Sequence, residues 1–305
     1  MAVTSAIIDK SVFQRLCKTN NSPLWSELLK RYQLVLPAVL VEEVLVNVLD
    51  PRSKLLAEAP EMKLQLERLQ PCWMDDIREV AFREFVLGEK FATLPPPPNE
   101  FFKILFNLKS NDPELLVWLG ERRKLKDETV VQWKSAQQKF QLPNGADQLP
   151  DESTFLSKVV CPFLRHILDD PKKKEDFLWT VFEKTFQRNS ELSSEISTAI
   201  QNYSRQNLAQ YQITLICLTI RLCYFLGPIF QIQNGRKIVK TENQRNSFED
   251  EQYVASSMLG NRLITGDEEM ARIANAFRDV GLWKGTVIFV DPNRKLEDLI
   301  PAILV

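Results

Sequence analysis

Histidine, glycine and closely spaced cysteine pairs are all scarce in this 305-residue sequence, and each scarcity narrows the range of functions. The only histidine, His166, lies in a predicted helical region far from every candidate catalytic acid, which argues against Ser-His-Asp and Cys-His catalysis. The 5 cysteines show no C-x-x-C spacing, so neither a disulfide framework nor a zinc site is indicated, and the reducing cytoplasm is the expected location. Only 9 glycines, with a middle rich in Leu, Glu, Lys and Gln, favour a mixed but helix-heavy fold.

The chain also lacks a large net charge and an uninterrupted apolar span. Its formal net charge of -1 excludes a global polycation, so any contact with nucleic acid must come from a local basic patch. The first ten residues contain no cationic region, which argues against a signal peptide. The most apolar stretch, residues 213–230, is interrupted by Arg221 and by Gly227-Pro228. We therefore expect a buried core helix there and no membrane partner.

Short apolar segments alternate with helical patterns at both ends of the chain. Strands are predicted at residues 5–9, 33–36, 262–265 and 286–290, and the last of these should be buried on both faces because it is continuously apolar. Helices are predicted at residues 11–18 with Ser11 as the N-cap, and at 23–31, 38–49, 201–230 and 267–278. This alternation is typical of an α/β fold with a parallel sheet.

The alternation stops between residues 51 and 234, where long amphipathic helical patterns dominate. This region contains four of the six tryptophans, and we expect it to form its own core. It also contains a polyproline tract at residues 95–98. The predicted organisation is an α/β core formed by residues 1–50 and 235–305, split by a large all-helical insertion.

Four acidic residues occupy equivalent places around the predicted strands. Asp9 ends the first strand, Glu43 lies in the helix after the second, Asp250 lies near a helix start, and Asp267 follows the strand 262–265. Because the carboxyl ends of parallel strands meet at one edge of a sheet, we expect these carboxylates to converge. Carboxylates buried together repel one another unless a cation intervenes.

An all-oxygen site of this kind suits Mg²⁺ or Mn²⁺. A metal held there can lower the pKa of a bound water and offset the charge that develops on a phosphodiester during hydrolysis. The sequence leaves some neighbouring acids as alternatives. Glu42 competes with Glu43, and Glu249 and Glu251 compete with Asp250.

Four segments resemble, in order, the four acidic motifs of PIN-domain nucleases. They are AIIDKSVF at residues 6–13, LPAVLVEEVL at 36–45, DEQYVA at 250–255 and LITGD at 263–267. The resemblance implies a Rossmann-like parallel sheet, a Mg²⁺ or Mn²⁺ site and, most often, endoribonuclease activity. It does not cover the helical middle region, which a minimal PIN domain lacks.

The resemblance also implies roles for individual residues. The catalytic acids would be Asp9, Glu43, Asp250 and Asp267, and the metal ligands among them Asp9, Asp250 and Asp267. The family usually has Thr or Ser and then Asn after its first Asp, whereas Lys10 and Ser11 follow Asp9 here. The supporting hydroxyls would then be those of Ser11 and Thr265. The residues predicted to hold the nucleic-acid backbone are Lys10, Arg236, Lys237 and Arg262.

The sequence therefore predicts a metal-dependent endoribonuclease that acts on RNA, most simply single-stranded. The helical insertion could bind a protein partner or mediate self-association. Two alternatives remain open. One is a structure-selective DNA nuclease, and the other is a non-catalytic interaction protein that keeps the PIN fold as a scaffold.

Overall fold

Four strands form a single all-parallel sheet in the order β2-β1-β3-β4. They are β1 (Thr4–Ile8), β2 (Tyr32–Val35), β3 (Arg262–Thr265) and β4 (Thr286–Phe289). This computed structural model describes residues 4–18, 22–49, 57–69, 72–90, 112–186, 194, 197–198, 212–233 and 241–295. The predicted α/β class with a parallel sheet is confirmed.

The two ends of the sequence meet in the middle of the sheet. Strand β1 pairs with β2 on one side and with β3 on the other, with Ile7 opposite both Val35 and Leu263. Residues 6–8 are fully buried, because helices cover both faces of the central strand. The ends of β1 and β3 consequently lie side by side, although they are far apart in the sequence.

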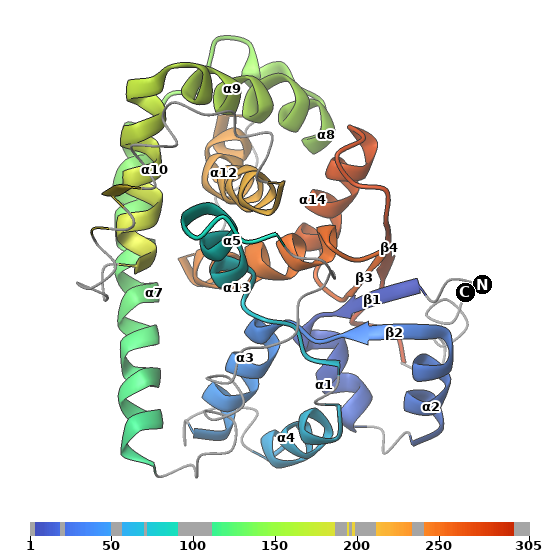
Figure 1. The fold of residues 1–305 in the computed structure, drawn as a ribbon. Coiled ribbons are helices and arrows are strands. Elements are labelled where there is room, and N and C mark those ends of the chain that lie inside the picture. Colours follow the sequence, from blue (N-terminus) through green and yellow to red (C-terminus); the bar gives the residue numbers. More distant parts are fainter. Residues whose placement is uncertain are drawn as a thin grey trace.

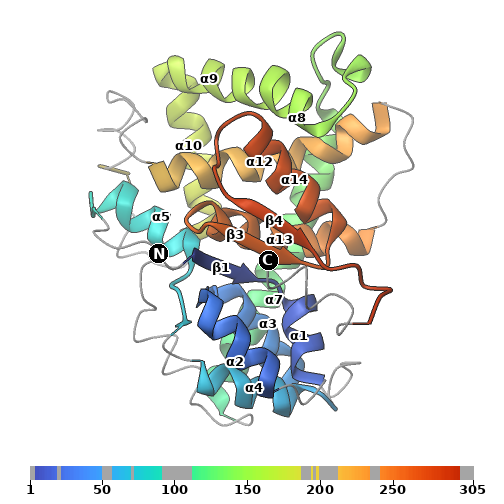
Figure 2. The same ribbon diagram turned by 90° about the vertical axis from the view of Figure 1, so that its right-hand side faces the viewer.

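Helices lie on both faces of the sheet (Figures 1 and 2). One face carries α1 (Lys10–Lys18), α2 (Ser22–Arg31), α3 (Ala38–Leu49) and α4 (Ala59–Arg68). The other face carries α13 (Thr241–Met258) and α14 (Glu268–Asp279), with α5 (Ile77–Val86) and α12 (Gln212–Gln233) packed beyond them. The predicted bounds of α3 and β3 are confirmed to the residue.

The remaining helices extend this second face. They are α7 (Pro113–Lys139), a short 3₁₀ turn (Ala146–Gln148), α8 (Glu152–Phe155), a π-helical turn (Leu156–Val160), α9 (Cys161–Asp169) and α10 (Pro171–Phe186). Helix α7 runs along the side of the molecule and contacts α12 and α13 (Figure 1). The expectation that the helical region forms its own core is wrong. One continuous cluster of buried side chains joins Ile7 of the sheet to Phe155 and Leu226 of the helices.

Two local predictions are corrected by the structure. Helix α1 is capped by Asp9 and not by Ser11, because the Val12 backbone N–H donates to Asp9 Oδ1 at 2.8 Å. Strand β4 is not buried on both faces, since Thr286 and Phe289 are exposed. It is the edge strand of the sheet, and an apolar run alone does not reveal that position.

Helix α12 is both long and apolar. Among the described residues it is the one helix long and apolar enough to cross a membrane by length and composition. It packs against α5 and α13, and 61% of its apolar window is buried inside the protein, as predicted for a core helix. The polyproline tract, Arg236, Lys237 and the segment 296–305 lie outside the described residues.

Candidate functional site

The candidate site lies where β1 and β3 end. Asp9 follows β1, and Thr265, Gly266 and Asp267 end β3 and open α14. Helix α13 crosses this edge and contacts both strands. In both cases a short strand rich in branched residues is followed by a capping acid, directly at Asp9 and after a glycine turn at Asp267.

Asp9 is the most constrained acid of the site. Its side chain is 2% exposed, and it accepts hydrogen bonds from the hydroxyls of Ser11 and Thr265 and from the backbone N–H groups of Val12 and Gly266. Burial raises the pKa of Asp9, although these hydrogen bonds act to lower it. Two carboxylate oxygens offer about four acceptor positions, so these donors occupy them. Asp9 therefore ties the end of β1 to the end of β3 and is not open to a further ligand.

Gly266 is needed at this junction for steric reasons. A Cβ atom on Gly266 would lie 2.6 Å from Ser11 Oγ and 3.3 Å from the Val290 carbonyl oxygen. Ser11 and Thr265, predicted as supporting hydroxyls, both donate to Asp9 in the structure. Thr265 Oγ1 also accepts the Asp267 backbone N–H at 2.9 Å, so one hydroxyl links two of the predicted acids.

The structure separates the adjacent acids of α3. Glu43 faces the candidate site, where its Oε2 accepts from the Tyr253 hydroxyl at 2.8 Å. Its Oε1 pairs with Lys10 Nζ, also at 2.8 Å. Glu42 turns away and pairs with Arg122 of α7. Glu43 is therefore the acid of this pair that belongs to the site, and Lys10 neutralises it.

The three consecutive acids of α13 also have different surroundings. Glu249 pairs with Lys126 of α7 at 2.5 Å, and Glu251 is buried 4.0 Å from Arg221. Burial raises the pKa of Glu249 to about 7 even though Lys126 acts to lower it. No hydrogen bond or ion pair reaches the Asp250 carboxylate from the described part of the chain.

Asp250 and Asp267 are the two acids that remain open. Burial, followed by the charges of Asp267 and Glu43, raises the pKa of Asp250 well above its usual range. Asp267 caps α14, with its Oδ1 accepting the Met270 backbone N–H at 2.8 Å. Both side chains are half-buried, so they keep access to solvent.

Tyr224 of α12 adds a group that sequence reasoning missed. It is 2% exposed, and its hydroxyl has no hydrogen-bond partner among the described residues. Burial, followed by the charges of Asp250, Glu269 and Asp267, raises its pKa well above the ordinary value. The only sequence signal was a single tyrosine within an apolar helix.

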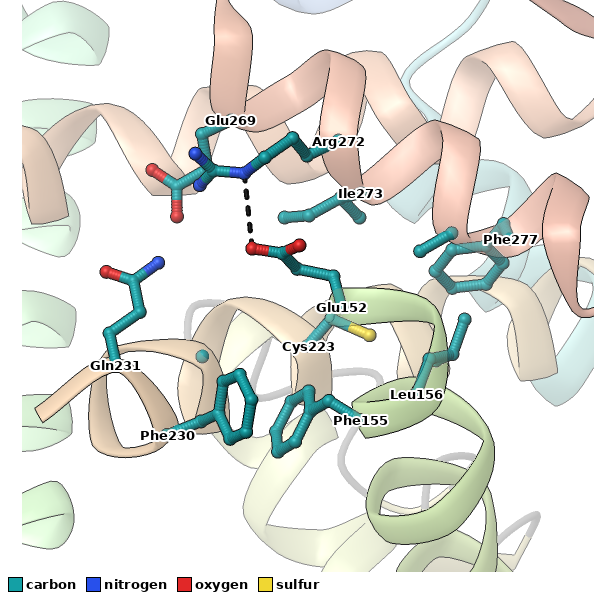
Figure 3. Close-up of a pocket in the computed structure, with 12 residues that line it drawn as sticks. Glu152, Phe155, Leu156, Cys223, Phe230, Gln231, Glu269, Arg272, Ile273 and Phe277 are labelled. Atoms are coloured by element: carbon teal, nitrogen blue, oxygen red, sulfur yellow. Dashed lines mark ion pairs between the residues drawn. The ribbon is translucent and has the colours of Figure 1, made fainter. Parts of the chain in front are cut away.

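A small pocket flanks the site on the side of α14, between α8 and α12 (Figure 3). Arg272 Nε lies 3.3 Å from Glu152 Oε1 above an apolar floor, in which the rings of Phe155 and Phe230 stack at 4.5 Å. An internal ion pair over stacked rings indicates a packing seam between helices. We therefore assign the chemistry to the open acids and not to this pocket.

The predicted substrate-binding cations lie in different places in the structure. Lys10 lies at the site but pairs with Glu43. Arg262 was placed incorrectly, because it begins β3 and thus lies at the opposite end of that strand from the acids. There it donates to the Tyr32 hydroxyl at 2.6 Å. Arg236 and Lys237 lie outside the described residues.

The acids do not form a ready-made metal cage. Among the described residues, no three acidic, histidine or cysteine side chains lie close enough together to hold a metal ion. Comparisons with known proteins add no assignment. A scan against protein-family models finds no match, and searches of curated proteins and of solved structures find none either.

Proposed function

We propose that this chain is a metal-dependent endoribonuclease with a PIN-like fold, whose reactive groups are Asp250 and Asp267. The observation that carries this proposal is the half-buried Asp250 carboxylate, which receives no hydrogen bond or ion pair from the described residues, together with Asp267, of which the helix cap engages only Oδ1. Burial of a carboxylate costs free energy, and the charge of Asp267 adds to the cost of ionising Asp250. Both costs are relieved by a hydrated divalent cation.

The donor set fits Mg²⁺ or Mn²⁺. Mg²⁺ keeps several of its waters and commonly uses one or two protein carboxylates together with substrate phosphates, so a cage of three ligands is not required. Bound between Asp250 and Asp267, such an ion would lower the pKa of a water and offset negative charge on the phosphate. Asp9 would hold the strand ends in place, and Glu43 would be held by Lys10 and Tyr253.

The protein groups have distinct tasks in this proposal. With such an ion bound, the Asp250 carboxylate would help to hold it and to position the attacking water. The Tyr224 hydroxyl donates a hydrogen bond that orients this water. Asp267 is fixed by its helix cap, so its second oxygen keeps a constant direction. The choice of RNA as substrate rests on the resemblance of the four acidic segments to PIN-domain nucleases.

One observation favours a non-catalytic interaction protein as the second candidate. Lys10 neutralises Glu43, and hydrogen bonds occupy Asp9, so half of the predicted acid set is satisfied within the protein. A scaffold that had lost its metal would show this pattern. The two candidates differ in whether the protein cleaves RNA when Mn²⁺ is added.

Replacement of Asp267 by Asn tests the proposed activity directly. Asn caps a helix as well as Asp, so Asp267→Asn should fold normally while losing the charge. We expect Mn²⁺-dependent cleavage of a labelled single-stranded RNA to fall roughly 100-fold or more. Glu268→Gln, an exposed neighbour in the same helix, is the matched control and should keep full activity. Absence of cleavage by the wild-type protein, with chelator-treated samples as blanks, would favour the interaction protein.

Replacement of Tyr224 by Phe separates a role in the reaction from a role in packing. Tyr224→Phe removes only a hydroxyl that has no partner in the described structure, so the melting temperature should stay the same or rise. We expect kcat to fall about tenfold with little change in KM, because the hydroxyl acts on the attacking water. An unchanged kcat would exclude Tyr224 from the reaction.

A further inference from the structure

A groove opens beside the acidic site, between α3, α7 and α13. Its volume is about 460 Å³. Its cationic lining residues are Lys10, Arg122, Arg123 and Lys126. Three of these four belong to α7, which lies outside the segments that resemble a PIN domain.

Carboxylates hold most of these cations in position. Lys126 pairs with Glu249, Arg122 with Glu42, and Lys10 with Glu43. A lysine ammonium has three donors and a guanidinium has five, so one carboxylate leaves further N–H groups for a second anion. These ion pairs also neutralise three of the four acids that line the groove, of which Asp127 is the fourth. The groove thus presents oriented cations, and the exposed Arg123, which also interacts within the protein, lines it as well.

The spacing of the α7 cations suits a polymer of phosphates. Arg122 and Lys126 are four residues apart, so they lie on the same face of the helix at a separation of about 6 Å along its axis. This is comparable to the distance between neighbouring phosphates of an extended strand. The groove adjoins the site, since Glu43 lines it and its carboxylate also accepts the Tyr253 hydroxyl at the site.

We propose that this groove binds the phosphate backbone of single-stranded RNA and guides it to Asp250 and Asp267, with α7 supplying the principal contacts. The identity of the strand rests on the proposed nuclease function. The proposal that the groove binds phosphates rests on its cations and their spacing. It gives part of the helical region a role in substrate binding.

Binding and cleavage are measured separately to test this. Fluorescence anisotropy with a labelled single-stranded RNA of about ten nucleotides, in chelator so that no cleavage occurs, gives the affinity of the full chain. Arg123→Ala and Lys126→Ala should each weaken binding about tenfold and reduce the dependence of log Kd on log salt by roughly 0.7. Lys124→Ala is the matched control, because this lysine lies on the same helix with its side chain 76% exposed and does not line the groove. It should change binding less than about twofold.

The outcomes distinguish the groove from the nuclease proposal. The proposal for the groove is overturned if Lys124→Ala loses as much RNA affinity as Arg123→Ala and Lys126→Ala, or if these two variants lose none. It is also overturned if the wild-type protein binds no RNA. Groove-dependent binding without Mn²⁺-dependent cleavage supports the groove and removes the proposed activity. Equal binding of single-stranded DNA also supports it, because the contacts are to the backbone.

Discussion

The Asp250→Asn variant is expected to be more stable than the wild-type protein in the absence of metal and to be inactive as a nuclease. Burial and the charges of Asp267 and Glu43 oppose ionisation of Asp250, and Asn removes that charge at nearly constant shape. We expect the melting temperature at neutral pH to rise by about 2–4 °C. Mn²⁺-dependent cleavage should fall by about a thousandfold, since a metal ligand is lost.

The pH dependence of stability provides a second readout for Asp250. Its pKa is higher in the folded protein than in the unfolded chain. The stabilising contribution of its protonated form to the free energy of unfolding is therefore fully present below the pKa of Asp250 in the unfolded chain. It is lost as the pH rises through the pKa of Asp250 in the folded protein. The wild-type free energy of unfolding should decrease relative to that of Asp250→Asn over this range, and the difference between the two proteins should vanish at acidic pH.

Metal binding should reverse the order of stability. Mn²⁺ should raise the melting temperature of the wild-type protein, because a ligand that binds only the folded state stabilises it, and it should have no effect on Asp250→Asn. Asp147→Asn, at an exposed site in a 3₁₀ turn, controls for the loss of one negative charge. A variant that is less stable than wild type at neutral pH, or that still responds to Mn²⁺, would remove Asp250 from the metal site.

Local patterns predicted α3 and β3, because these patterns are strong. Asp250, predicted near a helix start, lies instead in the middle of α13, which begins at Thr241. Pro37 followed by apolar residues at helical spacing defined α3, and a branched segment between glycine turns defined β3. Features that depend on strand order could not be read in this way. The exposure of β4 follows from its position at the edge of the sheet. Asp9, and not Ser11, is the N-cap of α1 because Asp9 directly precedes the first residue of that helix.

The site itself was predicted only in part. The sequence supplied the acids and their order, but it left Glu42 and Glu43 equivalent because both are acidic residues of the same helical turn. Their different roles depend on α7, which contributes Arg122 from a distant part of the chain. Tyr224 depends in the same way on how α12 packs against α13. No local pattern contains the relative placement of helices that are separated by long stretches of sequence.

Asp9→Ala is expected to destabilise the whole fold, because Asp9 joins the first strand to the last third of the chain. The substitution leaves the Thr265 hydroxyl and the Val12 backbone N–H without their acceptor in a buried place, whereas the Gly266 N–H keeps Ser11 Oγ at 3.2 Å. Buried donors without partners cost about 1–3 kcal/mol each, and the losses at one site add only in part. We therefore expect a decrease in the free energy of unfolding of about 3–5 kcal/mol, measured by urea denaturation.

Ser11→Ala is the matched comparison for this junction. It removes a single hydroxyl donor to Asp9 and leaves the contacts from Thr265 and Gly266 in place, so its cost should be about 1 kcal/mol. In Asp9→Ala, amide hydrogen exchange should accelerate in β3 as well as in β1, since the carboxylate bridges both strands. If Asp9→Ala instead kept the stability of the wild-type protein and lost only metal-dependent cleavage, Asp9 would be a metal ligand and not the junction that its hydrogen bonds indicate.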